Sequence, residues 1–145
     1  MSSMFDLTDR VSLVSGAASG MGKAIALAVA EAGSDVVLAD INEEGAQATA
    51  SEIEALGRKA LPVVCDIASP EAIREMFSQI DATFGRIDFV ANIAGEAVRK
   101  KPEVIELEEV EWTWRNIVYG RFCICQEAGR RMLEQGRGSI INLGS

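Results

Sequence analysis

The sequence predicts an α/β fold in which a doubly wound parallel sheet lies between two layers of helices. Short apolar segments alternate with longer segments whose apolar residues recur every three or four positions, a pattern typical of strands alternating with amphipathic helices. The apolar segments carry no regular polar alternation, as expected of parallel strands that are covered on both faces. Neither a linker rich in Pro and Gly nor an internal repeat divides the 145 residues, so we expect one domain over residues 1–145.

Five short apolar segments are the predicted strands. They lie at residues 11–14, 36–39, 60–64, 87–91 and 139–143. Capping residues mark the helices between them: Asn42 is the expected N-cap of a helix that stops at Gly57. Ser69, with Pro70 at the first helical position, starts another helix that stops at Gly85. With right-handed crossovers, this order of elements predicts a three-layer, doubly wound sheet.

The first and the last predicted helices flank the segments that carry chemistry. The first begins near Gly20, and its apolar face consists of Met21, Ile25, Ala28, Val29 and Ala32. The longest runs from about Leu107 to Gln135 and ends at Gly136. Trp112 and Trp114 lie two positions apart in it and cannot share a face, so we expect one of them in the core or in an interface.

The charge and residue counts exclude several classes of function. The 22 Asp and Glu residues outnumber the 14 Lys and Arg residues, and the resulting net charge of −8 argues against binding to nucleic acid. The sequence contains no His, which excludes Ser–His and Cys–His nucleophile pairs and His-ligated metals, so no metal site is expected. No signal peptide and no membrane span are indicated, and the three cysteines are expected to be reduced, as in a cytoplasmic protein.

A Gly-rich turn follows the first predicted strand. The segment from Ser15 to Gly22 (SGAASGMG) allows a tight bend and a close approach of the backbone to a pyrophosphate. The helix that begins near Gly20 would point its free N–H groups at that anion, as in a Rossmann-like dinucleotide site. A nucleotide-binding P-loop is excluded, because it would need Gly where Ala17 stands and Ser or Thr where Ala24 stands.

An acidic residue ends the second predicted strand. Asp40 lies 18 residues after Gly22, where a dinucleotide fold places a carboxylate against the adenosine ribose. Such a carboxylate accepts hydrogen bonds from the ribose hydroxyls and repels the additional phosphate of NADP. No basic residue compensates, since Ser19 lies inside the Gly-rich turn and Ile41 follows the acid. These residues favour NAD over NADP.

With these two features the chain resembles the short-chain dehydrogenase/reductase family, and three later segments match that family's motifs in order. Cys65-Asp66-Ile67 resembles the segment whose acid touches the adenine ring, and Asn92-Ile93-Ala94-Gly95 is similar to Asn-Asn-Ala-Gly, with Ile as the second residue. The segment from Gly138 to Ser145 resembles the strand that ends in the active-site serine, which here is Ser145. The resemblance implies a cofactor site made of Ser15, Gly16, Ser19, Gly20, Met21, Gly22, Asp40, Ile41, Cys65, Asp66, Ile67, Asn92, Ala94 and Gly95.

The resemblance also implies an Asn in the long helix that helps to hold a catalytic water relay. Counting back from Gly120-Arg121-Phe122 places that Asn at Ile117, whereas Asn116 lies one residue early. A shift of one residue rotates a helical side chain by about 100°. Asn116 can therefore take the catalytic role only if the helix carries a local bulge.

The implied activity is the NAD-dependent interconversion of a secondary alcohol and a ketone, by an enzyme that acts on a small molecule and forms a homodimer or homotetramer. The family's acid–base Tyr and its partner Lys lie a dozen or more residues beyond the serine. The single Tyr, Tyr119, is not in a Tyr-x-x-x-Lys context. We therefore expect the chain to be the N-terminal part of a dehydrogenase, incomplete after the fifth strand and inactive alone.

Two alternatives stay open: a nucleotide-binding module without catalysis, and a degenerate remnant that binds nothing. In the 145-residue chain the fifth strand, residues 139–143, would be an exposed apolar edge, although it is expected to be central in the whole protein. We expect the chain by itself to be marginally stable or prone to aggregation.

Overall fold

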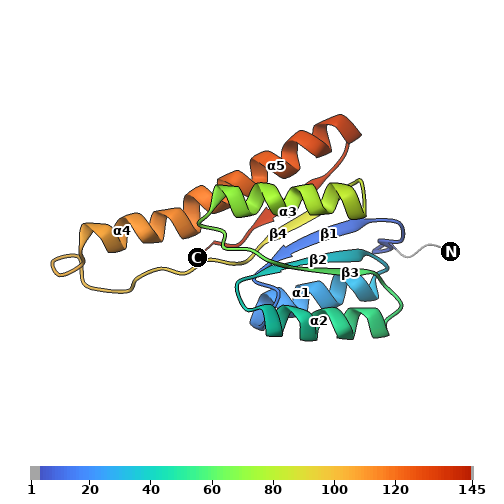
Figure 1. Cartoon of the computed structure of the whole chain (residues 1–145), viewed down its shortest axis with the longest axis horizontal. Coiled ribbons are helices and arrows are strands. Elements are labelled where there is room, and N and C mark those ends of the chain that lie inside the picture. Colours follow the sequence, from blue (N-terminus) through green and yellow to red (C-terminus); the bar gives the residue numbers. More distant parts are fainter. Residues whose placement is uncertain (1–3, 145) are drawn as a thin grey trace.

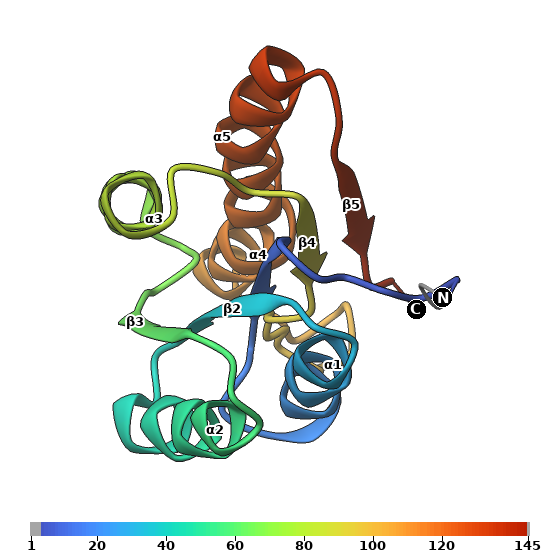
Figure 2. The same cartoon turned by 90° about the vertical axis from the view of Figure 1, so that its right-hand side faces the viewer.

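A computed structural model describes residues 4–144 and confirms the predicted class of fold (Figure 1). Five parallel strands form one sheet in the order β3-β2-β1-β4-β5. They are β1 (Val11–Ser15), β2 (Asp35–Asp40), β3 (Ala60–Val64), β4 (Phe89–Asn92) and β5 (Ser139–Asn142). Figure 2 shows α1 (Gly20–Glu31) and α2 (Glu43–Ala55) on one face of the sheet, and α3 (Pro70–Thr83) and α5 (Gly120–Gln135) on the other.

The central strands are buried on both faces, which is why they show no polar alternation. In β1, Leu13 packs with α3 and α5, whereas its neighbour Val14 packs with α1 and α2. Both side chains are fully buried. The layer under α1 and α2 uses small residues such as Ala26 and Ala30, which let α1 lie close to the sheet. The Gly-rich turn before α1 is thereby held against the ends of the strands.

The predicted caps form. The side chain of Asn42 accepts a hydrogen bond from the Gly45 amide at 3.0 Å, and Ser69 does the same for Ala72 at 3.2 Å. Pro70 is the first residue of α3. The helices α1, α2 and α3 therefore start close to where the sequence placed them.

Strand β4 begins two residues later than predicted. The Ile87 amide does not donate to a neighbouring strand, because it donates to the side chain of Gln135 at 3.0 Å, and the Ile87 carbonyl accepts from that side chain at 2.7 Å. Since a side chain from α5 satisfies both backbone groups, Ile87 lies outside the ladder although its side chain is fully buried.

The long predicted helix is continuous but not uniformly α-helical. It consists of α4 (Leu107–Trp114), a π-helical turn η1 (Arg115–Tyr119), and α5. The π turn inserts one extra residue into the helical register, which is the local bulge that the position of Asn116 required. Within residues 4–144, no helix is both long and apolar enough to cross a membrane.

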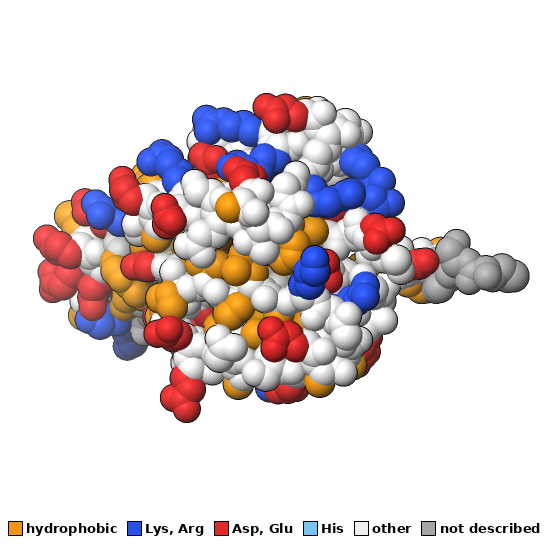
Figure 3. All heavy atoms as spheres, turned by 45° about the vertical axis from the view of Figure 1, so that its right-hand side comes forward, with side chains coloured by type: hydrophobic (Ala, Val, Ile, Leu, Met, Phe, Trp, Pro, Cys, Tyr) orange, Lys and Arg blue, Asp and Glu red, His pale blue; other side chains and the backbone are white. Residues whose placement is uncertain are grey.

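The loop between β4 and α4 is charged and exposed. Figure 3 shows acidic side chains, with Lys and Arg among them, at the end of the molecule that carries α4 and this loop. The side chain of Lys100 pairs with Glu109, which connects the loop to α4. The mixture of both signs is typical of a solvated surface.

Strand β5 is an edge strand of the sheet described by residues 4–144. It pairs with β4 alone. Ile140 packs against the core under α3 and α5, whereas Ile141, on the other face, is 44% exposed. The predicted apolar edge is therefore present.

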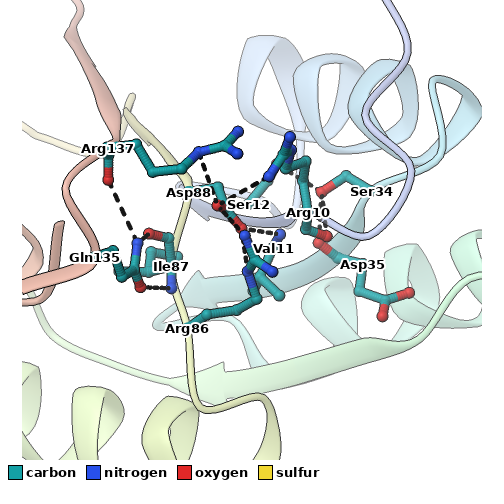
Figure 4. A network of polar contacts seen from close by, with 10 residues as sticks. All are labelled: Arg10, Val11, Ser12, Ser34, Asp35, Arg86, Ile87, Asp88, Gln135 and Arg137. Atoms are coloured by element: carbon teal, nitrogen blue, oxygen red, sulfur yellow. Dashed lines mark hydrogen bonds and ion pairs between the residues drawn. The ribbon is translucent and has the colours of Figure 1, made fainter. Parts of the chain in front are cut away.

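A buried carboxylate lies at the amino ends of the strands, opposite the Gly-rich turn (Figure 4). Asp88 accepts a hydrogen bond from the Val11 amide at 2.9 Å and two from the Arg86 guanidinium at 2.8 and 2.7 Å. Arg10 and Arg137 approach it at 3.8 and 4.0 Å. This network joins the start of β1 to β4 and to the segment that precedes β5.

Candidate functional site

A cavity of about 410 Å³ opens at the carboxyl ends of the strands. It lies where the strand order reverses between β1 and β4, the place where open α/β sheets bind their ligands. Its walls come from the segments that follow β1, β2, β3 and β4, and from α4 and η1. The lining residues are Gly16, Ser19, Met21, Gly22, Ala39, Asp40, Ile41, Cys65, Asp66, Ile67, Ile93, Ala94, Gly95, Glu96, Trp112 and Asn116.

The turn after β1 is tight because two glycines meet in it. A Cβ atom on Gly22 would lie 1.9 Å from the carbonyl oxygen of Gly16, so only Gly lets the first turn of α1 approach so closely. Gly16 itself has a φ of +76°. The Thr49 hydroxyl of α2 donates to the Ala17 carbonyl at 3.0 Å and holds the turn from below.

The amino end of α1 lines the cavity, and no side chain caps its free backbone N–H groups. Ser19 is the N-cap residue, yet its side chain makes no capping hydrogen bond. No acidic residue lies in the first turn of α1. The free N–H groups and the positive end of the helix dipole therefore favour an anion at this point, and Met21 and Gly22 form the adjacent wall.

Asp40 is held in a fixed orientation at the end of β2. Its Oδ2 accepts a hydrogen bond from the Ala18 amide and its Oδ1 one from the Asn42 amide, both at 2.9 Å. Each oxygen keeps a lone pair for a further donor, such as a hydroxyl. Among the described lining residues there is no Lys or Arg, so the charges on this wall are all negative.

The segment after β3 supplies an apolar wall and one acid. Burial, with the neighbouring Asp66 carboxylate and Cys123, raises the pKa of the Cys65 thiol to about 11. Cys65 is thus a neutral thiol at pH 7 and serves as a small apolar residue rather than as a nucleophile. The Asp66 carboxylate accepts a hydrogen bond from the Ala68 amide at 2.9 Å, which fixes the turn that carries it.

The segment after β4 is held by β1. The buried hydroxyl of Ser15 accepts hydrogen bonds from the Ile93 and Ala94 amides, both at 3.1 Å. Ser15 does not line the cavity; it positions the residues that do. Asn92 is fully buried and does not line the cavity either, because its Nδ2 donates to Asn142 of β5 at 2.8 Å.

Asn116 lies in the π turn and lines the cavity. It is 9% exposed, and its side-chain amide donates to the Trp112 carbonyl at 3.0 Å. Trp112 lines the same cavity, whereas Trp114 lines a groove on the outer side of the helix with Tyr119. The structure thus places neither Trp in the core, and it separates them onto two surfaces, as their spacing requires.

The structure brings together most of the predicted site residues. Three predicted residues do not line the cavity: Ser15, Asn92, and Gly20, which is the first residue of α1. Ser145 lies outside the described residues. Four lining residues were missed: Ala39, Ile93, Glu96 and Trp112. Ala39, Ile93 and Glu96 each adjoin a predicted residue and could have been inferred. Within residues 4–144 no group of three or more potential ligands is arranged to hold a metal ion.

The proteins that this chain matches in sequence and in structure are dehydrogenases. The sequence profile of the family described as short chain dehydrogenase matches residues 10–145. The chain is 38% identical over 141 residues to a D-threitol dehydrogenase of Mycolicibacterium smegmatis. The matched region covers 97% of this chain and 54% of that protein. It is also 38% identical over 141 residues to an NAD-dependent glycerol dehydrogenase of Listeria innocua, with the same coverage of 97% and 54%.

Solved structures agree with the sequence matches. The fold superposes on a short-chain type dehydrogenase/reductase from Mycobacterium marinum with a TM-score of 0.93 and 38% identity, over 98% of this chain and 56% of that one. The fold also superposes on a 7α-hydroxysteroid dehydrogenase complexed with NADH and 7-oxo glycochenodeoxycholic acid, with a TM-score of 0.93 and 29% identity. That match covers 97% of this chain and 55% of the other. The chain spans about half the length of the relatives that it matches.

Proposed function

The chain belongs to the short-chain dehydrogenase family, and from the geometry of its cleft we propose that it binds NAD, in preference to NADP, across the carboxyl edge of the sheet. The main support for this proposal is the position of Asp40. Its carboxylate is fixed beside the uncapped amino end of α1, on a wall whose described residues include no Lys or Arg. A 2′-phosphate placed there would meet a like charge and no counter-charge.

The residues of the cleft fit a dinucleotide in one direction. The amino end of α1, with Gly16 and Gly22, would hold the pyrophosphate. Asp40 and Asp66, on the β2 and β3 side, would take the adenosine half. The nicotinamide half then falls on the β4 side, against Ala94, Gly95 and Asn116.

The proposed reaction of the whole protein is the interconversion of a secondary alcohol and a ketone. The bound cofactor supplies a hydride acceptor or donor. Asn116, held by the Trp112 carbonyl within the cleft, would keep the water relay in place, and Ser145 would bind the substrate oxygen. Two matched relatives are named for threitol and glycerol, both of which carry secondary alcohols.

We propose that these 145 residues alone bind the dinucleotide without turnover. Proton transfer in the family needs a Tyr in the cleft, and the single Tyr119 is 61% exposed in the groove on the outer side of η1. General acid–base catalysis contributes about 10²–10⁴-fold to a rate, so its loss would leave little activity.

The exposed aromatic side chains of Trp114, Tyr119 and Phe122 support assembly of the protein into a homo-oligomer.

Titration calorimetry with NADH and with NADPH tests the choice of cofactor. The wild-type chain is expected to bind NADH more tightly than NADPH, and Asp40→Asn should reduce that preference about tenfold, because the repulsion of the phosphate is lost. Asp35→Asn is the matched control: it removes the same charge from the opposite end of the same strand. Equal binding of NADH and NADPH by the wild type, or an effect of Asp35→Asn equal to that of Asp40→Asn, would refute the assignment.

A further inference from the structure

Arg121, the second residue of α5, joins two loops at the carboxyl edge of the sheet. Its Nη2 and Nε atoms donate to the Ala94 carbonyl at 3.1 and 3.3 Å, and its Nη1 donates to the Leu143 carbonyl. Ala94 belongs to the segment after β4 that lines the cleft. Leu143 follows β5 and lies two residues before Ser145.

The surrounding backbone is shaped to receive this guanidinium. A Cβ atom on Gly95 would lie 3.1 Å from Arg121 Nη2 and 3.0 Å from a methyl group of Ile117, so the absence of a side chain lets the guanidinium lie against the loop. The register of the helix is equally specific. The π turn immediately precedes Gly120, where a Cβ atom would lie 2.0 Å from the Ile67 carbonyl, and this contact sets the rotation of Arg121.

No other side chain among the described residues donates to both loops. β4 and β5 are paired in parallel, and the Leu143 amide donates to the Asn92 carbonyl at 3.1 Å. Among the described residues no further backbone hydrogen bond joins the two loops, and Arg121 connects them with three hydrogen bonds from a rigid, charged group. Hydrogen bonds from a charged donor are about twice as strong as those between neutral groups.

We propose that Arg121 is a positioning residue that fixes the nicotinamide side of the cleft. The inference rests on the proposed function, in which the adenosine half lies toward Asp40 and the other half toward Ala94 and Gly95. By holding Ala94 and Leu143 in one frame, Arg121 keeps the wall of the cleft at a set distance from the end of β5. The residue contributes nothing to the adenosine side, because its contacts lie on the β4 and β5 side alone.

The first arm of the test needs no ligand. Amide hydrogen exchange, followed by NMR on the 145-residue chain, reports on the Ala94 and Leu143 amides, which donate to Ser15 and Asn92. Arg121→Met, which keeps the length of the side chain and removes its donors, should speed exchange at both amides by about tenfold. Arg121→Lys, which offers one nitrogen and the same charge, should give an intermediate rate and serves if the Met variant does not fold.

The second arm separates positioning from general loss of structure. The Kd for NADH should rise about tenfold in Arg121→Met and recover in part in Arg121→Lys, whereas the Kd for AMP should stay within about twofold of wild type. AMP occupies only the adenosine side, so a merely structural role would weaken both ligands equally. Arg115→Met, on the exposed side of η1, is the matched control and should change neither Kd.

The outcomes are distinct. Unchanged exchange at Ala94 and Leu143 in both Arg121 variants overturns the inference, as does an equal loss of NADH and AMP binding. A wild-type chain that binds AMP and NADH, with the selective loss of NADH in the Met variant, supports it. A wild-type chain that binds neither nucleotide overturns the proposed function, and with it the positioning role, even where exchange shows that Arg121 joins the loops.

Discussion

At the scale of single residues, two carboxylates at opposite ends of the strands do different work. Asp40 faces the cleft with lone pairs to spare, whereas Asp88 is enclosed by donors. Burial acts to raise the pKa of Asp88, but the hydrogen bonds from Arg86 and the Val11 amide, with the charges of Arg86 and Arg10, outweigh it and hold the pKa below its ordinary value. Asp88 is therefore charged in the folded chain and stabilises it.

Asp88→Asn is expected to destabilise the chain by about 2 kcal/mol, because it removes the buried carboxylate that accepts hydrogen bonds from Arg86 and from the Val11 amide. Since the folded pKa is depressed, the stabilisation is complete above the unfolded pKa of about 3.9 and is lost as the pH falls through the folded pKa. Urea unfolding of both proteins between neutral pH and about pH 3 should therefore show a gap that narrows in acid.

Asp81→Asn provides the control for that series. Asp81 pairs with Arg131 on the surface, with its side chain 48% exposed, so its loss should cost less than about 1 kcal/mol. Equal losses for the two variants, or a gap that widens in acid, would contradict the role given to Asp88.

At the scale of elements, the π turn decides which residues of the long helix reach the cleft. It lies between Trp112 and Gly120, so α4 and α5 differ in register by one residue. Asn116 and Trp112 consequently line the cavity while Gly120 lies against the Ile67 carbonyl. An unbroken α-helix could not satisfy both contacts, because one residue corresponds to about 100° of rotation.

Deletion of Val118 should convert η1 into ordinary α-helix and turn Asn116 away from the cleft. We expect the helical circular dichroism to persist and the Kd for NADH to rise at least about tenfold. Val118→Ala keeps the length of the helix and is the control; Val118 is 37% exposed, so this change should have little effect. NADH binding that is unaffected by the deletion would show that the π turn does not shape the site.

The elements differ in how far the sequence could predict them. Strands such as β2 follow from an apolar pattern, and α2 and α3 follow from their caps at Asn42 and Ser69, all of which are local signals. The start of β4 could not be predicted, because Gln135, 48 residues away, takes the backbone groups of Ile87. The spacing of Asn116 required a bulge, but a single sequence does not indicate that Trp112 turns toward the cleft.

At the scale of the whole molecule, two of the surfaces that expose apolar side chains could form contacts between copies of the chain. One is the open side of β5, where Ile141 is 44% exposed. The other is the outer face of η1 and α5, with Tyr119 and Phe122 each more than 60% exposed. A net charge of −8 opposes nonspecific association. Because Tyr119 and Phe122 are larger and more exposed than Ile141, we expect the outer helical face to dominate self-association.

Light scattering on the eluting chain should therefore report a species larger than a monomer. Phe122→Lys is expected to shift that species toward the monomer, because it places a charge within the apolar face. Leu56→Lys, at the end of α2 and 47% exposed, is the control and should leave the mass unchanged. A monomeric wild type would contradict the assembly proposed here.

Binding of the dinucleotide at the carboxyl edge of the sheet is measured most directly by titrating the chain with NADH and recording amide proton–nitrogen correlation spectra. Binding at the cleft predicts the largest shifts at the amides of Gly20, Met21 and Gly22, with further shifts in residues 65–67 and 93–96, and little change around Asp88. No shift at millimolar NADH, or shifts confined to residues outside the cleft, would contradict the assignment of this edge of the sheet as the dinucleotide site.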